Sequence, residues 1–187
     1  MNILNKTLAA AITALALQAH AAPYQAIVPA KSSVTFSYKQ MGVAVDGRFK
    51  KFAAQVNFDP AKAEAGKASF EVELASVDAG SSEADDEVVT KSWFNVAAFP
   101  KASFVAKQFK QTAPNQYEVI GTLSIKGQSR EVKFPMKHNV QGKDGVLTGG
   151  FNLKRGDFNI GEGMWAKFDV VANDIQVNFS LTAQTGK

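Results

Sequence analysis

Residues Ser92–Phe104 read Ser-Trp-Phe-Asn-Val-Ala-Ala-Phe-Pro-Lys-Ala-Ser-Phe, and the rest of the chain is organised around this stretch. The stretch holds four large aromatic side chains, and each such side chain buries about 150–250 Å², so this many are not left in water. Phe99 precedes Pro100, whose ring disfavours a helical residue before it. The stretch therefore predicts a compact aromatic plug at one end of a β-barrel, leading into a strand that starts near Ala102.

Apolar and polar residues alternate along most of the chain outside the plug. This is the pattern of strands with one buried face and one wet face. No strand–helix alternation appears, so a parallel α/β sheet is not favoured. The pattern predicts an all-β fold, a single antiparallel β-barrel of about eight strands, which we prefer to a sandwich because closure removes exposed edges. The strand runs are 33–39, 52–58, 68–74, 102–107, 117–125, 130–140, 147–153 and 168–181.

Two features interrupt the alternation. In the last run, the apolar parity switches between Val170 and Ile175, and a bulge over 172–174 would produce that switch. Gly121 and Gly149 fall inside strand patterns, where a glycine marks a bulge, a corner or the close approach of something bulky.

One short helix is expected over 85–90. Ser82 and Asp85 have the spacing of a capping box, with further acids in the first turn. The acids between Glu83 and Glu87 do not match the calcium-loop pattern, so we interpret them as a solvated helix start.

The N-terminus has the anatomy of a secretory signal peptide. Lys6 precedes the apolar run Thr7–Leu17, and Ala19–Ala21 supplies a small-x-small cleavage site. The run is too short to span a membrane, so stable membrane insertion is not expected. We therefore expect residues 1–21 to be removed and residues 22–187 to form one periplasmic domain.

The composition offers little to a catalytic or metal site. The chain has no cysteine, and His138 is the only histidine after the signal segment. Zinc and copper sites of ordinary composition need more such ligands, and no Gly-x-Ser-x-Gly nucleophile elbow is present. A net charge of +4 is too mild to indicate nucleic acid. We expect no metal and no enzymatic activity.

Three segments resemble the YceI-like family of polyisoprenoid-binding periplasmic proteins. Lys91–Phe104 is similar to the family's Phe-Phe-Asp-Val followed by Tyr-Pro and a Phe-bearing strand. Gly121–Val132 is similar to its Gly-x-Leu-Thr-Ile-x-Gly-x-Thr-x-x-Val hairpin. Leu153–Gly161 is similar to its Arg-x-x-Phe-x-Ile-Gly motif. Order and spacing agree over essentially the whole chain after the signal segment.

The chain departs from the family pattern at three positions. Asn95 stands where Asp is usual, Phe99 replaces the commoner Tyr, and Asn159 occupies a typical Gly position. None of these changes removes apolar lumen surface, so they bear on head-group preference rather than on binding itself.

The resemblance implies a lipocalin-like barrel with an isoprenoid tail threaded through its lumen. The cargo would be an isoprenoid lipid of the ubiquinone-like or polyprenyl phosphate type, and no other cofactor is expected. Alternation of the strands, not the family, assigns the lumen side chains. They are Phe36, Tyr38, Phe52, Val56, Phe70, Phe104, Leu123, Phe134, Phe151, Phe168 and Val177.

Other side chains are assigned to the ends of the lumen. Candidates for head-group contact are His138 and Arg155, although a satisfied structural histidine is the more common case. Trp165 either closes the mouth over a ligand or packs as an anchor. The side chains expected to close the lumen ends are Trp93, Phe94, Phe99 and Trp165.

These features favour a periplasmic protein that carries or sequesters isoprenoid lipids. A promiscuous scavenger of hydrophobic small molecules has the same lumen requirements. A structural or partner-binding barrel filled by its own rings is also compatible, because the chain has 14 phenylalanines. An enzyme acting on the lipid is the weakest alternative, because no nucleophile–base pair is visible. The sequence leaves a homodimer open.

Overall fold

The computed structural model describes residues 22–186, so the expected signal peptide, residues 1–21, lies outside the described residues. Eleven strands form one antiparallel sheet. They are β1 (Tyr24–Ile27), β2 (Ser33–Gln40), β3 (Val43–Phe49), β4 (Phe52–Asn57), β5 (Lys67–Glu73), β6 (Val77–Asp78), β7 (Lys101–Ala113), β8 (Gln116–Ile125), β9 (Gln128–Gln141), β10 (Asp144–Lys154) and β11 (Asp174–Thr185).

Helical segments are few and short. The described residues contain one α-helix, α1 (Ser82–Val88). The short 3-10 helices are η1 (Pro29–Lys31), η2 (Pro60–Ala65), η3 (Leu74–Ser76), η4 (Arg155–Phe158) and η5 (Gly163–Trp165).

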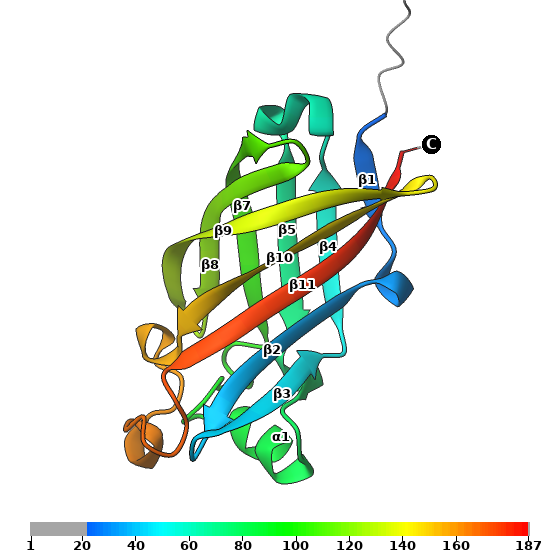
Figure 1. Cartoon of the computed structure of the whole chain (residues 1–187). Helices are drawn as coiled ribbons and strands as arrows, with labels where there is room; N and C mark the ends of the chain where they lie inside the picture. Colours follow the sequence, from blue (N-terminus) through cyan, green and yellow to red (C-terminus); the bar gives the residue numbers. More distant parts are fainter. Residues whose placement is uncertain (1–21, 187) are drawn as a thin grey trace, which may run out of the picture.

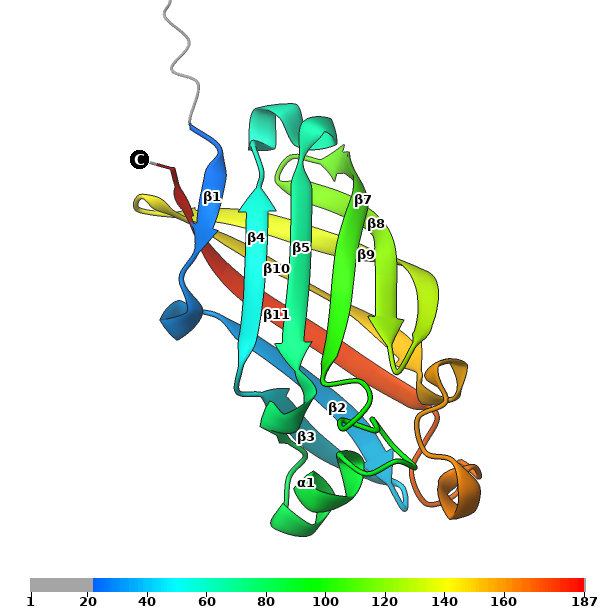
Figure 2. The same ribbon diagram turned by 180° about the vertical axis from the view of Figure 1, so that it is seen from behind.

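The sheet curls until its two edges approach each other. Its strands follow the order β4-β5-β7-β8-β9-β10-β11-β2-β3-β6, and β1 pairs with the end of β11. The backbones of Tyr24 in β1 and Phe58 after β4 exchange two hydrogen bonds, of 2.9 and 3.0 Å. Strands β9, β10, β11 and β2 cross in front of β4, β5 and β7 in Figure 1, and Figure 2 shows the opposite face.

The sequence prediction of an all-β fold with one short helix is confirmed, but the expected eight strands are corrected to eleven. The strands missed were β1, β3 and β6. Strand β1 has four residues and β6 has two, which is too short for an alternation to show. Strand β3, Val-Ala-Val-Asp-Gly-Arg-Phe, has no clean apolar stripe because it carries Asp46 and Gly47 in its middle.

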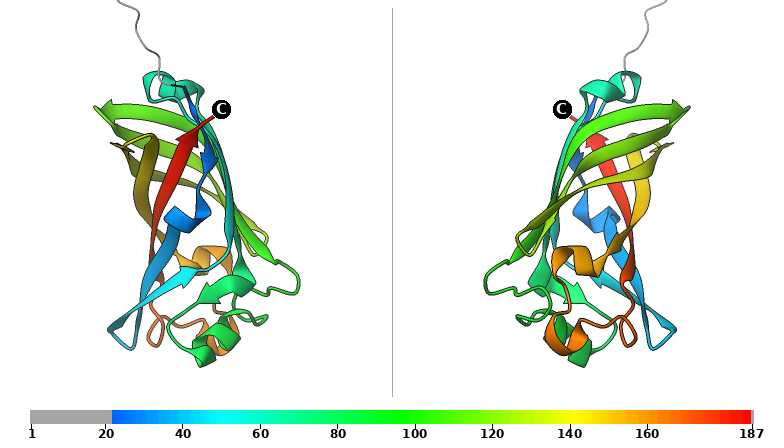
Figure 3. Two further views of the ribbon diagram at one scale, coloured as in Figure 1. Left: turned by 90° about the vertical axis from the view of Figure 1, so that its right-hand side faces the viewer. Right: turned by 90° about the vertical axis from the view of Figure 1, so that its left-hand side faces the viewer.

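The two ends of the curled sheet differ. Helix α1 and the segment 155–171 gather at one end, and η2 and the described termini lie at the other (Figure 3). We call the first of these the α1 end. The aromatic plug of Ser92–Phe104 runs from α1 into β7, so it belongs to the α1 end.

Helix α1 begins earlier than the sequence predicted. It spans Ser82–Val88, and its N-cap is Ser81, whose Oγ accepts a hydrogen bond of 3.2 Å from the N–H of Ala84. Ser81 has extended backbone angles, as an N-cap residue requires. The spacing of Ser82 and Asp85, three positions apart, predicts Ser82 as the cap, and this prediction is wrong by one residue.

The last strand also differs from its prediction. Strand β11 starts at Asp174, and residues 167–170 form a turn, so Phe168 and Val170 are not part of a strand. The predicted bulge over 172–174 is therefore wrong. The apolar positions change from even to odd numbers because Val170 lies in a turn, whereas Ile175 lies in strand β11.

Interior glycines make room for aromatic rings, as one of their predicted roles required. A Cβ on Gly121 would overlap Cζ of Phe104, and a register shift in β7 lies beside it. A Cβ on Gly149 would lie 2.6 Å from Cζ of Phe179. Rings from neighbouring strands thus occupy the space above these glycines.

His138 lies in the apolar core at the end opposite α1. Its side chain is 3% exposed, and its ring centroid is 5.2 Å from that of Tyr24 and 6.1 Å from that of Phe58. Among the described residues neither ring nitrogen has a hydrogen-bond partner, and burial lowers the pKa of His138. The ring packs outside the cavity described below, so the structure does not place His138 beside that cavity, as the sequence hypothesis of a head-group contact would require.

We expect His138→Leu to be at least as stable as the parent at neutral pH, because it removes buried nitrogens that each cost about 1–3 kcal/mol when unpaired. The unfolded chain takes up a proton near pH 6.5, above the lowered pKa of the folded state, so His138 makes stability fall as pH drops through that region. Urea unfolding at pH 7.5 and at pH 5 measures the free energy of unfolding. Between these two pH values, that free energy should fall by less in the variant than in the parent. Equal losses in both proteins would mean that the folded protein also protonates His138, with a hydrogen-bond acceptor for the imidazolium N–H groups.

Candidate ligand-binding cavity

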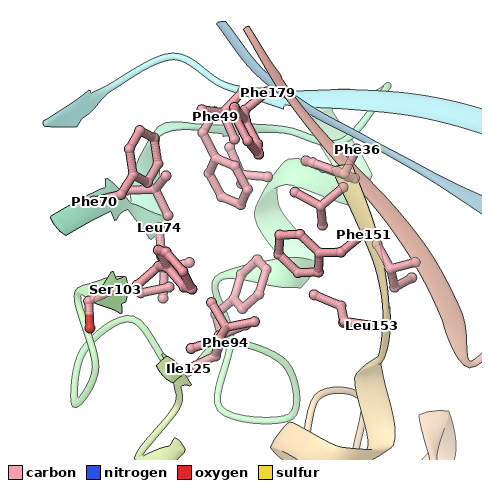
Figure 4. A pocket seen from close by; sticks show the side chains of 18 of the residues that line it. Phe36, Phe49, Phe70, Leu74, Phe94, Ser103, Ile125, Phe151, Leu153 and Phe179 are labelled. Carbon is pink, nitrogen blue, oxygen red and sulfur yellow. The ribbon is translucent and has the colours of Figure 1, made fainter. Parts of the chain in front are cut away.

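The curled sheet encloses an elongated apolar cavity of about 550 Å³. This volume falls in the range of about 300–1,000 Å³ that is typical of small-molecule sites. Ile175, Val177, Phe179 and Leu181 line it from alternate positions of β11, a span of about 20 Å at the usual rise per residue. Figure 4 shows Phe36, Phe70 and other labelled side chains converging on this space.

Most of the side chains assigned to the lumen by alternation do line the cavity. Phe134 lies at the centre of an aromatic group, with ring centroids 5.3–5.6 Å from those of Phe104, Phe151 and Phe179. The volume that remains shows that the rings do not fill the lumen. The predicted side chains that line the cavity are Phe36, Tyr38, Val56, Phe70, Phe104, Leu123, Phe134, Phe151 and Val177.

Two predicted lumen residues lie elsewhere. Phe52 is the first residue of β4, and its ring stacks on Phe70 at a centroid distance of 5.5 Å, where it lines a side groove beside β3. Phe168 lies in the 167–170 turn, is 47% exposed and stacks on the guanidinium of Arg155 at 4.8 Å. Alternation does not apply to a turn, so it misplaced Phe168.

Several lining residues were not assigned by sequence reasoning. Phe49 enters the cavity from β3, the strand without a clear pattern. Ile175, Phe179 and Leu181 share the parity of Val177, so the alternation already contained the signal that would have found them. Glu87 was interpreted as part of a solvated helix start, yet it also lines the cavity.

Two tryptophans and one glutamate close the cavity at the α1 end. The indole N–H groups of Trp93 and Trp165 both donate to Oε1 of Glu87, at 3.1 and 2.8 Å. The two ring centroids are 5.5 Å apart, and both rings line the cavity. Trp165 therefore packs as an anchor and also lines the end of the cavity, where closure over a ligand stays a prediction.

The rest of the plug supports this closure. Phe94 lines the cavity and packs near Phe49, whereas Phe99 lies outside it, with its ring over Gly127 in the β8–β9 turn. Asn95 and Asn159 both have left-handed backbone angles, with φ of 52° and 54°. Asparagine tolerates this region better than most residues, so these two departures from the family pattern preserve the turns.

The guanidinium of Arg155 holds the surrounding loop together and has no N–H group free for a head group. Its side chain is 1% exposed, and its N–H groups donate to six backbone carbonyls at 2.8–3.2 Å. These bonds use all five N–H donors of a guanidinium. The carbonyls belong to Ile160, Gly161, Trp165, Lys167, Val171 and Ala172.

A second cation fixes the same loop from the β8–β9 turn. Lys126 is 8% exposed, and its Nζ donates to the carbonyl of Asn159 at 2.6 Å and to Glu162 at 2.7 Å. The backbone N–H groups of Gly161 and Glu162 donate to the carbonyl of Ser92 in the plug. Plug, loop and hairpin turn thus form one closed end.

Within residues 22–186, no group of three or more His, Cys, Asp or Glu side chains is placed to hold a metal ion. No helix in that part of the chain is long and apolar enough to cross a membrane.

Comparisons with known proteins agree on one family. A family model described as the YceI-like domain matches residues 25–183. A UPF0312 protein of Azotobacter vinelandii is 32% identical over 170 residues, covering 84% of this chain and 88% of the relative. The crystal structure of Burkholderia cenocepacia BcnA is 39% identical, with a TM-score of 0.82, and the match covers 85% of this chain and all of that one.

A more distant structure shares the fold alone. A polyisoprenoid-binding domain from Saccharophagus degradans, implicated in plant cell wall breakdown, superposes with a TM-score of 0.67 at 14% identity. The match covers 89% of this chain and 99% of that domain.

We expect Arg155→Lys to lower the free energy of unfolding by about 3 kcal/mol or more. An ammonium has three N–H donors instead of five, and each buried carbonyl left unpaired costs about 1–3 kcal/mol. Urea denaturation followed by circular dichroism measures the change.

The adjacent exposed residue provides a matched control. Lys154→Arg makes the reverse exchange one position away, and a surface change of this kind should stay within about 0.5 kcal/mol. An equally small effect of Arg155→Lys would show that the six hydrogen bonds do not stabilise the closed end.

Proposed function

Because the chain belongs to the YceI-like family, we propose that it binds a long isoprenoid lipid in its cavity and carries or sequesters that lipid in the periplasm. The observation that carries this proposal is the continuous apolar cavity, which runs from Ile27 near the described termini to Trp93 at the α1 end. The Saccharophagus degradans domain, described as polyisoprenoid-binding, has the same fold and supports the proposal. The signal-like residues 1–21 support the periplasmic location.

The energetics fit a carrier that also releases its cargo. Burial of each methylene gains about 0.8 kcal/mol, so a lipid of tens of carbons nominally exceeds the practical limit of about −20 kcal/mol. Ordering the lipid's rotatable bonds and the lining side chains offsets much of that gain. A moderate net affinity follows, and shielding the tail from the aqueous periplasm is itself the function.

The proposal is tested by native mass spectrometry and lipid extraction of protein purified from bacteria that express the full chain. A stoichiometric isoprenoid lipid is the expected result. A mixture of unrelated hydrophobic compounds would instead favour the promiscuous scavenger. Protein that stays empty when offered isoprenoid lipids would contradict the proposal.

We expect Ala54→Trp to reduce lipid uptake at least about tenfold, because Ala54 lines the cavity and an indole there occupies space that the tail requires. Ala53→Trp is the matched control, since Ala53 is the preceding residue of β4 and is exposed. A tenfold loss corresponds to about 1.4 kcal/mol. Uptake is measured by titration of delipidated protein, with circular dichroism confirming the fold. Equal uptake by the two variants would place the tail outside this cavity.

A further inference from the structure

The charged side chains that line the cavity all belong to its α1 end. Among the described lining residues they are Glu83, Glu87 and Arg155, and no lysine is among them. The head group of a bound lipid carries its polar atoms, so these three side chains bear on which head group the cavity accepts.

The charged and aromatic hydrogen-bond donors at this end are already used within the protein, and the uncharged amide of Gln40 is the one lining donor here for which the described residues show no partner. Arg155 donates all its N–H groups to backbone carbonyls. The hydroxyl of Tyr38 donates to the carbonyl of Ala79 at 2.9 Å, and both indoles donate to Glu87. A phosphate is bound by free, charged donors, and this end offers none.

Acceptors, by contrast, remain available. Oε1 of Glu87 receives both indole N–H groups, and within the described residues no hydrogen bond reaches Oε2. Glu83 adds a second carboxylate at this end, where hydrogen bonds from its own backbone N–H and from Ser81 and Ser82 lower its pKa. Both carboxylates favour a ligand group that donates a hydrogen bond.

We propose that this end of the cavity selects an uncharged, hydrogen-bond-donating head group, such as the terminal hydroxyl of a polyprenol, over a phosphate. This inference rests on the proposed function and names the class of lipid that the same cavity takes. Glu87 determines the choice of head group. Its Oε1 accepts hydrogen bonds from Trp93 and Trp165, while its Oε2 accepts a hydrogen bond from the head group of the ligand. A phosphate near Glu87 meets a like charge, and among the described lining residues no free cationic donor compensates for it.

Two ligands that share one tail test this directly. Delipidated protein is titrated with geranylgeraniol and with geranylgeranyl monophosphate, and binding is followed by isothermal calorimetry and by tryptophan fluorescence, because both tryptophans of the chain line the cavity. The alcohol should bind at least about fivefold more tightly, the effect of two like charges about 4 Å apart even at the dielectric constant of water. Higher salt should narrow the difference, since this end of the cavity reaches exposed side chains such as Glu83.

Glu87→Gln identifies the responsible side chain. The amide oxygen still accepts from both indoles, while the negative charge is lost and N–H donors are gained. The preference for the alcohol should shrink about fivefold. Glu64→Gln is the matched control, because it makes the same change of charge on the exposed side of η2 at the opposite end, and it should leave the preference unaltered.

The outcomes separate the two proposals. Equal affinities, or tighter binding of the phosphate to the unmodified protein, would overturn the head-group inference and leave lipid binding intact. Failure of both ligands to bind would overturn the proposed function and the inference with it. If Glu87→Gln does not fold, Glu83→Gln carries the same test, with a smaller shift expected because that carboxylate is exposed.

Discussion

The buried guanidinium of Arg155 is the interaction on which the closed end of the molecule depends. A charge taken out of water is costly unless hydrogen bonds replace its hydration. Here six backbone carbonyls replace it, and all of them belong to the irregular segment between η4 and β11. A loop without regular pairing thereby obtains partners for carbonyls that would otherwise be buried alone. The position of Trp165, and therefore the end of the cavity, follows from this arrangement.

The hollow interior has a different origin. Strand alternation turns many rings inward, but glycines opposite or beside those rings let them lie flat along the wall. Gly47 lies against Phe36, and Gly121 lies against Phe104 in the same way. Rings that lie along the wall leave the centre of the sheet open. The curled sheet can therefore be rich in phenylalanine and still contain a cavity of about 550 Å³.

The polar end and the apolar body of the cavity have separate roles. The body is lined mostly by apolar side chains with no hydrogen-bonding direction, so the tail of the proposed ligand would be held there by volume and contact area alone. At the α1 end, Glu87 is oriented by two indoles and Arg155 is fully engaged, so the few polar atoms there are held in place. Under the proposed function, this end would orient the ligand, because the body supplies little directional contact.

The sequence by itself determined the all-β class, the positions of the long strands and the inward face of most of them. Alternation with a period of two is a local property, and nine of the eleven side chains that it assigned to the lumen line the cavity. It failed where the chain leaves the pleat, as at Phe168, and where a strand is too short or too polar to show a pattern, as in β3. Only the tertiary structure decided that Arg155 and His138 are buried, that Glu87 turns inward and that the lumen stays hollow. These outcomes depend on contacts between residues far apart along the chain, such as Glu87 with Trp165, and no local pattern encodes such contacts.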